Sequence, residues 1–125
     1  MKKVIATKNA PAAIGPYSQA VQVGDILFAS GQLGVNPSTG EFSAGGVQEQ
    51  TAQSFKNIRA ILDEAGYSIG DVVKTTVFLA EMSDFTAMNE IYVQQFTDAF
   101  PARSTVAVKT LPKNALVEIE VIAVK

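Results

Sequence analysis

The residues best suited to chemistry are an arginine and a glutamate near the end of the chain. Arg103 follows a proline at the start of an apolar segment, where its planar guanidinium can hold a carboxylate through two parallel hydrogen bonds. Glu118, on the next predicted strand, can move a proton or position a water molecule beside it. The alternative for Arg103 is a structural ion pair with Glu90 or Asp98. The chain has no Cys, His or Trp, so these two side chains carry most of the available chemistry.

Glu118 has a structural interpretation too. Glu118 and Glu120 are alternate residues of one strand, so both can belong to a solvated face. Ile122 and Val124 continue that face as apolar residues, which favours a partly buried surface. In such a surface the pKa of a carboxyl rises, because burial and a neighbouring like charge both disfavour ionisation.

Four other residues are weaker candidates for a binding site. Ser30 offers a hydroxyl at the end of an apolar strand, and Gly31 beside it permits close approach of the backbone. Tyr17 lies in a loop that prolines hold firmly, and Asn89 is a polar residue on a predicted helix. Each of these also fits an ordinary role in packing.

Composition narrows the function classes. The 125 residues, of which 47% are hydrophobic and 18% charged, predict a single domain spanning 1–125. A net charge of −2 with scattered lysines argues against nucleic acid as a partner. The lack of Cys and His excludes disulfides, a cysteine nucleophile and the usual zinc sites. No apolar run is long enough for a signal peptide or a membrane span, so we expect a cytoplasmic protein without membrane contact.

The elements that position these residues can be predicted from periodicity. Strands are expected over 3–7, 20–23, 26–32, 72–80, 103–108 and 116–124, and a glycine-rich loop over 33–46. A helix is expected over 47–65, ended by Gly66, and a second helix after Ser83 or Asp84. The buried stripes of the two helices are Phe55, Ile58, Leu62 and Ala65, and Phe85, Met88, Tyr92 and Phe96.

This order of elements predicts an α+β fold in which a mixed β-sheet carries both helices on one face, because two strand–helix–strand crossovers occur. The strand over 72–80 has apolar residues on both of its sides, including Val77 and Phe78. Two helices cannot cover both faces of a sheet. We therefore expect the second face to be buried against other copies in a closed homo-oligomer.

Several segments together resemble one known family. They are AIGPYSQ at 13–19, ASGQL at 29–33, VKTTVFL at 73–79, the segment 84–92, FPARS at 100–104, LPK at 111–113 and VEIE at 117–120. In this order the chain resembles the RidA/YjgF/L-PSP family of reactive-intermediate deaminases over nearly its whole length.

The resemblance implies a chorismate-mutase-like fold assembled as a homotrimer, with an active site between each pair of neighbouring subunits. It implies hydrolysis of 2-aminoacrylate, 2-aminocrotonate and their imine forms, 2-iminopropanoate and 2-iminobutanoate, to 2-oxo acids and ammonia. The ligand would be a small imine, enamine or 2-oxo acid. No metal or cofactor would be required, because the intermediate is already electrophilic.

The resemblance also implies roles for individual residues. Arg103 would hold the substrate carboxylate, and Glu118 would activate the attacking water and return a proton to ammonia. Substrate-binding residues would be Tyr17, Ser30, Gly31, Asn89 and Thr105. Many family members have a cysteine at the position of Thr105, so thiol chemistry is not expected here.

Two other functions remain open from the sequence. The same cleft can serve a non-catalytic metabolite-binding regulatory protein that senses a 2-oxo acid. An endoribonuclease or translation inhibitor is favoured less, because the chain is acidic and has no histidine.

Overall fold

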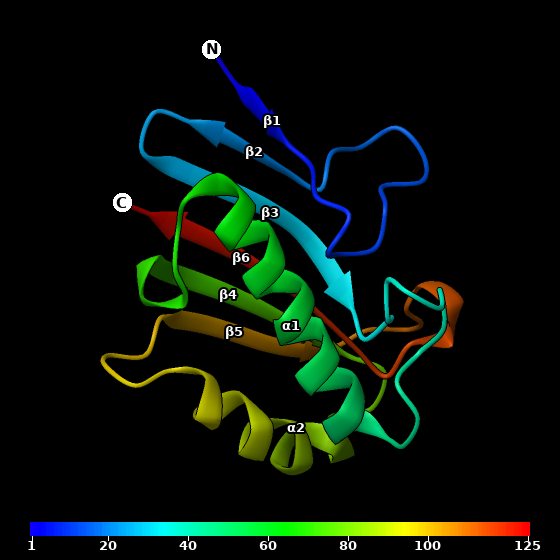
Figure 1. Ribbon diagram of the computed structural model, residues 1–125. Coiled ribbons are helices and arrows are strands. Elements are labelled where there is room, and N and C mark those ends of the chain that lie inside the picture. The colour runs from blue at the N-terminus through cyan, green and yellow to red at the C-terminus, as the bar shows by residue number, and fades with distance from the viewer.

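A computed structural model describes all 125 residues, which form one six-stranded sheet with two helices (Figure 1). The strands are β1 (Lys3–Ile5), β2 (Ala20–Val23), β3 (Ile26–Leu33), β4 (Val72–Leu79), β5 (Ala102–Ala107) and β6 (Val117–Val124). The helices are α1 (Val47–Ala65) and α2 (Phe85–Tyr92), both on the same face of the sheet. The predicted α+β class, with a mixed sheet and two helices on one face, is confirmed.

The strand order in the sheet is β1-β2-β3-β6-β4-β5. β4 and β5 pair in parallel across the α2 crossover, and the other neighbours are antiparallel. β5 and β6 follow each other in the chain, but β4 lies between them in the sheet. Arg103 on β5 and Glu118 on β6 are therefore not on adjacent strands, contrary to what their order in the sequence suggested.

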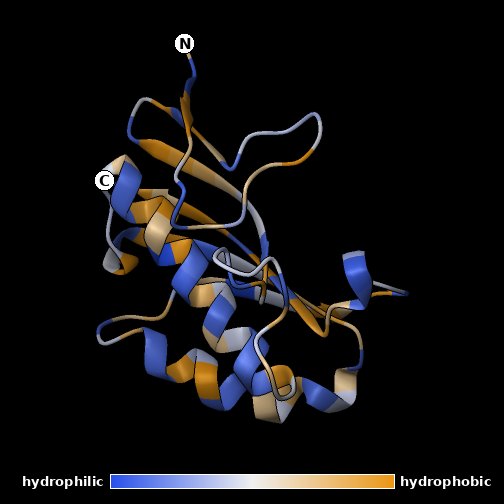
Figure 2. Cartoon of the chain, turned by 45° about the vertical axis from the view of Figure 1, so that its right-hand side comes forward, coloured by the Kyte–Doolittle hydropathy of each residue, from blue (hydrophilic) through white to orange (hydrophobic).

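The core lies between the sheet and α1. Val77 of β4 pairs with Ile119 of β6, and both point toward the helices and are fully buried. Phe55 and Ile58 of α1 are buried against this face, as the apolar stripe predicted. Each such side chain stabilises the fold by about 1.5–3 kcal/mol. Figure 2 shows the strands mostly in the hydrophobic colour and much of the outer surface of the helices in the hydrophilic colour.

The first helix begins and ends at the predicted residues. Its C-terminal stop is Gly66, which adopts φ 82° and donates its N–H to the carbonyls of Leu62 and Asp63. A residue with a Cβ is strained in this left-handed conformation, so glycine ends the helix at low cost. At the other end, the Glu49 carboxylate accepts a hydrogen bond from the Gly46 N–H at 2.7 Å.

Asn57, a buried polar residue of α1 that the apolar period did not predict, holds the loop 33–46. Asn57 Nδ2 donates to the carbonyl oxygens of Leu33 at 3.1 Å and Val35 at 2.9 Å. Gly34 lies so close to the helix that an added Cβ would be 2.5 Å from Gln50 Cα. Buried amide groups need partners, and here the loop backbone supplies them. The loop is thereby clamped to α1.

The second helix is shorter than predicted. It ends at Tyr92, and a 3-10 turn over Val93–Gln95 carries the chain toward β5. The Arg59 guanidinium donates to the Gln95 carbonyl oxygen at 3.1 Å and so supports this end of the helix. Phe96 lies outside the helix but still packs on the core. At the start, neither Ser83 nor Asp84 caps the helix through its side chain, because a 3-10 turn (Met82–Asp84) leads directly into it.

The face of the sheet away from the helices is left uncovered by the chain itself. Apolar side chains on this face include Ile26 and Phe28 of β3, Val106 of β5 and Val124 of β6, and all four are exposed. The cross-strand pair of Ile26 with Val124 joins the apolar side chains of β3 and β6, whereas Val106 lies beside Phe78 further along the sheet. An exposed apolar surface of this kind is typical of an interaction site.

Neither helix is long and apolar enough to span a bilayer.

Candidate active site

A β-bulge places Ser30 and Gly31 at the site. Ala29 pairs with Val121 and Gln32 with Ile119, so β3 has one residue more than β6 between these two pairs. A bulge of this type bends the strand and redirects its side chains, and bulges are frequent beside active sites. Sequence reasoning identified both residues but took the Ser-Gly pair as the end of the strand.

The Glu118 side chain lies directly over the bulge. Glu118 pairs with Phe78 on β4 and points to the uncovered face of the sheet. A Cβ added to Gly31 would collide with the Glu118 carboxylate, lying 2.8 Å from its Cδ atom. Glycine at position 31 is therefore what lets the carboxylate pack against the β3 backbone.

This packing changes the acidity of the glutamate. Glu118 is half-buried, and burial raises the pKa of its carboxyl; the nearby Glu120 carboxylate raises that pKa further. Glu120 is exposed on the same strand face. A carboxyl with a raised pKa is better suited than an ordinary carboxyl to accept a proton and return it.

A cavity of about 660 Å³ adjoins this carboxylate. Among its lining residues are four that the sequence singled out: Tyr17, Ser30, Gly31 and Glu118. The clamped loop 33–46 contributes Leu33, Val35, Pro37 and Gly40 to the wall. One chain therefore brings these four predicted residues together in a single cavity.

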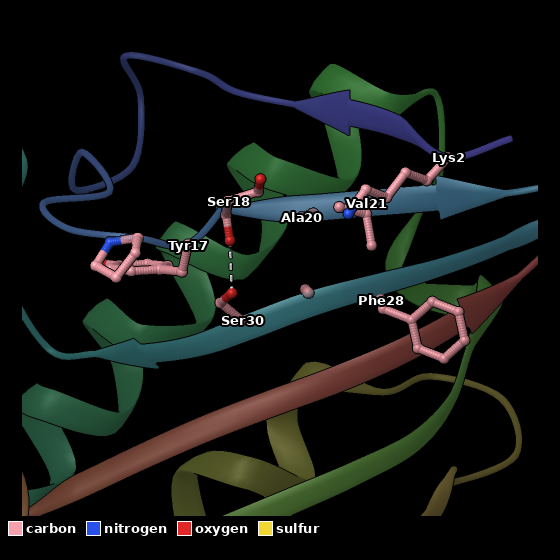
Figure 3. A pocket seen from close by; sticks show the side chains of 9 residues that line it. Lys2, Tyr17, Ser18, Ala20, Val21, Phe28 and Ser30 are labelled. Carbon is pink, nitrogen blue, oxygen red and sulfur yellow. Dashed lines mark hydrogen bonds between the residues drawn. The ribbon is translucent and has the colours of Figure 1, made fainter.

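Hydrogen bonds from Ser30 and Gln19 hold the loop that carries Tyr17. Ser30 Oγ donates to the Ser18 carbonyl oxygen at 2.6 Å, across a second cavity of about 510 Å³ (Figure 3). Gln19 is buried, and its side chain amide bonds the backbone of Thr7 and donates to the Pro11 carbonyl oxygen at 2.7 Å. Tyr17 itself is 53% exposed, so its ring stands at the mouth of the cavity and not in its floor.

The mouth also carries the one pair of strained residues in the chain. Lys113 and Asn114 adopt positive φ values of 57° and 56°, which residues with a Cβ rarely do. Lys113 lines the 660 Å³ cavity. Sequence reasoning placed these residues in a loop and gave them no role.

Arg103 forms a second cluster on the other side of the sheet. It pairs with Thr75 of β4 and points toward α2, where its Nη1 donates to Asn89 Oδ1 at 2.6 Å. Its guanidinium carbon lies 4.5 Å from the ring centre of Tyr92 and 5.4 Å from that of Phe85. The hydrogen bond goes to Asn89, not to either of the carboxylates considered as ion-pair partners.

Thr105 belongs to this second cluster. It is two residues beyond Arg103 on β5, faces the same side, and pairs with Val77. Its Oγ1 atom is buried and has no hydrogen-bond partner. A buried hydroxyl without a partner costs about 1–3 kcal/mol, so an unpaired group here is unusual.

Sequence reasoning missed the aromatic residues of this cluster as functional residues, although a signal was present. Phe85, Asn89 and Tyr92 are spaced by four and three residues, which places them on one helix face. The apolar period indicates Phe85 and Tyr92 only as members of the buried stripe.

The seven predicted site residues therefore form two half-sites within one chain. The first half-site comprises Tyr17, Ser30, Gly31 and Glu118, and the second comprises Asn89, Arg103 and Thr105. Glu118 points to the uncovered face and Arg103 to the helix side, with β4 between their strands. No cluster of three or more His, Cys, Asp or Glu side chains is arranged to hold a metal ion.

Comparison with known proteins gives full-length matches. The family model described as endoribonuclease L-PSP matches residues 7–125. A 2-iminobutanoate/2-iminopropanoate deaminase of Escherichia coli K12 is 52% identical over 128 aligned residues, covering 100% of this chain and 99% of the relative. A crystal structure of a putative endoribonuclease from Thermotoga maritima superposes with a TM-score of 0.97 at 51% identity, covering 100% of this chain and 98% of that one. The crystal structure of E. coli TdcF with bound serine has a TM-score of 0.94 at 48% identity, covering 98% of both chains.

Proposed function

Because this chain belongs to the RidA/YjgF/L-PSP family, we propose that it is an enzyme that hydrolyses reactive enamines and imines to 2-oxo acids and ammonia. The substrates would be 2-iminobutanoate and 2-iminopropanoate with their enamine forms, 2-aminocrotonate and 2-aminoacrylate. Support comes from relatives of E. coli, mouse and human that carry the name of this deaminase at 49–52% identity across the whole chain.

The observation that carries the proposal is the Glu118 carboxyl, which is half-buried over Gly31 at the wall of a 660 Å³ cavity. Imine hydrolysis needs a base for the attacking water and an acid for the departing nitrogen. A single carboxyl with a raised pKa can perform both tasks in turn, since the proton that it takes is the proton that it later gives.

In the proposed mechanism the substrate carboxylate is bound by Arg103 through paired hydrogen bonds. The Glu118 carboxylate takes a proton from water as the water oxygen bonds to the carbon of the protonated imine. This gives a tetrahedral, neutral carbinolamine. Glu118 then returns the proton to nitrogen, the carbon–nitrogen bond breaks and ammonia leaves, and the regenerated Glu118 carboxylate accepts the proton of the carbinolamine hydroxyl as the 2-oxo group forms. Ser30 and Gly31 line the substrate pocket, and Tyr17 narrows its mouth.

A complete site requires two copies of the chain, because Arg103 and Glu118 point to opposite sides of the sheet. We propose a homotrimer with a chorismate-mutase-like arrangement, in which the second half-site of one subunit faces the first half-site of its neighbour. The exposed apolar residues Phe28 and Val124 support this assembly, since they give the uncovered face a surface suited to burial. In the assembled site, Asn89 holds Arg103 and the free hydroxyl of Thr105 lies beside it.

The names of the family model and of the Thermotoga relative include endoribonuclease, so RNA cleavage is the second candidate function. The charge distribution does not favour it. The chain has a net charge of −2, the first half-site contains the Glu118 carboxylate, and the Glu120 carboxylate lies near enough to raise the pKa of Glu118. A phosphate backbone would be repelled there, because affinity for RNA depends on clustered cations.

The test of the proposed function is catalytic release of 2-oxobutanoate. Threonine and a threonine dehydratase generate the imine, and ammonia and 2-oxobutanoate are followed with and without this protein at substoichiometric concentration. We expect the protein to accelerate release over spontaneous hydrolysis, with many turnovers per chain. Binding of 2-oxobutanoate without acceleration would favour a regulatory protein, and stoichiometric cleavage of RNA that requires Glu118 would favour the ribonuclease.

The acidity of Glu118 predicts the pH dependence of this activity. Glu118 must be ionised to take a proton from water, so activity falls as the pH drops through its raised pKa. Glu120→Gln removes the like charge that contributes to the shift, so the pKa of Glu118 decreases. The acid limb of the kcat/KM profile should therefore move to lower pH in Glu120→Gln, with little change at the plateau. An unmoved or higher acid limb would separate Glu118 from the titration that controls activity.

A further inference from the structure

We infer that Tyr92 is a positioning residue of the anion site: its ring is the platform that fixes the guanidinium of Arg103. The inference rests on the proposed function, in which Arg103 binds the substrate carboxylate. It adds the residue that orients Arg103 for this binding. Tyr92 touches no reacting atom in this scheme, so it acts through Arg103.

The guanidinium has contacts that fix its place without neutralising it. Its carbon lies 4.5 Å from the centre of the Tyr92 ring, within the range of an effective cation–π contact. The ring of Phe85 adds a longer contact at 5.4 Å, and Asn89 accepts one hydrogen bond. All three partners are neutral.

Neutral partners matter because a guanidinium has five N–H donors in a planar fork. One donor is used by Asn89, and aromatic contact with Tyr92 and Phe85 uses none. Most of the fork therefore remains for a carboxylate. An Asp or Glu at this place would hold Arg103 equally well but would compete with the substrate for its charge.

The platform is itself rigid. The Tyr92 hydroxyl and Thr75 Oγ1 are hydrogen-bonded at 2.8 Å, and the tyrosine is only 4% exposed. Phe55 meets the ring edge-on at 5.7 Å between centroids, and Phe96 packs at 5.2 Å. Thr75 is the β4 residue that pairs with Arg103. The ring is thus bonded to the β4 residue beside Arg103, which limits movement of the ring relative to the arginine on β5.

The substitutions that test this role are Tyr92→Met and Tyr92→Phe. Methionine fills much of the same buried volume without a π face, whereas phenylalanine keeps the ring and loses only the bond to Thr75. A matched control is Tyr67→Met. Tyr67 is also buried, at 6% exposed, donates its hydroxyl to the Asp25 carbonyl oxygen at 2.9 Å, and has a cation, Lys125, 5.9 Å from its ring. It lies outside both half-sites.

The first measurement is binding of 2-oxobutanoate to the assembled protein by calorimetry, with KM and kcat for the imine. Loss of the platform should weaken binding about tenfold and raise KM similarly in Tyr92→Met, with kcat changed much less. Tyr92→Phe should retain affinity within about threefold of the wild type. Tyr67→Met should lower the melting temperature but leave KM unchanged. Equal affinity in Tyr92→Met and the wild type would overturn the inference.

The second measurement does not depend on activity. The chain has only two arginines, Arg59 and Arg103, so its Nε–H spectrum contains two arginine signals. The wild type should give a ring-shifted, slowly exchanging Arg103 signal, and Tyr92→Met should lose both properties while the Arg59 signal is retained. A mobile Arg103 signal in the wild type would overturn the inference, whether or not the imine is hydrolysed. A fixed Arg103 with no turnover would overturn the proposed function alone.

Discussion

Arg103→Ala should nearly abolish turnover of 2-iminobutanoate at low substrate concentration. The substrate carboxylate would lose a charge-assisted pair in a desolvated site. This loss should raise the activation free energy that corresponds to kcat/KM by about 2–5 kcal/mol. The loss should be found mainly in KM, because the carboxylate is bound in the ground state as well as in the transition state. Steady-state kinetics with enzymatically generated imine measure it directly.

The other arginine of the chain provides the control. Arg59 is exposed on α1 and donates to the Gln95 backbone, outside both half-sites. Arg59→Ala should leave kcat/KM within about twofold of the wild type, as is usual for surface changes. Arg103→Lys should be intermediate, since lysine keeps the charge but lacks the planar fork. Full activity in Arg103→Ala would refute the role of this residue in binding the carboxylate.

Mixed assemblies of two inactive variants should recover activity. Arg103→Ala keeps an intact first half-site with Glu118, and Glu118→Gln keeps an intact second half-site with Arg103. If each site joins half-sites from two neighbouring copies in a ring, random mixing of equal amounts restores about one quarter of the sites. Co-expression with two different affinity tags, followed by tandem purification, isolates the mixed assemblies for assay, and in each mixed homotrimer about one third of the sites should then be complete.

The same experiment distinguishes the possible locations of the site. A site built within one chain would lack either Arg103 or Glu118 in every copy, so mixing would restore nothing. Each variant assembled alone is the baseline, and a sample that carries both substitutions in one chain, mixed with wild type, is the control for dilution. Activity at the baseline in the mixed assemblies would refute a site shared between subunits.

Local signals predicted the regular elements well. The bounds of α1 followed from its apolar stripe and Gly66, because a left-handed stop after a periodic run has few alternatives. The same reasoning failed for α2, which we expected to include Phe96. The ring centroids of Phe96 and Phe55 are 5.9 Å apart, although Phe96 lies outside the helix. A residue can therefore satisfy the apolar period without being helical.

Features that depend on pairing could not be predicted locally. The bulge at Ser30 and Gly31 depends on how β3 aligns with β6, far away in the sequence. The clamp made by Asn57 on the loop backbone breaks the polar-outside pattern, because a buried amide is acceptable only where distant carbonyls meet it. The sequence of the helix alone shows neither of the two loop carbonyls that bind Asn57, and the sequence of β3 alone does not show its alignment with β6.

The candidate site shows the same division. The types of Arg103 and Glu118 suggested carboxylate binding and proton transfer, but their relative placement did not follow from a spacing of fifteen residues. That placement depends on β4 entering the sheet between β5 and β6, and on the parity of each residue in its strand. Only the three-dimensional arrangement places them back to back.

This back-to-back arrangement has a consequence for how activity depends on the number of chains in a cell. In the proposed homotrimer, a single chain would be chemically idle until it meets others of its kind. At low protein concentration, the number of complete sites in a cell would then rise more steeply than the number of chains. One defective copy would also inactivate sites that it shares with intact neighbouring copies.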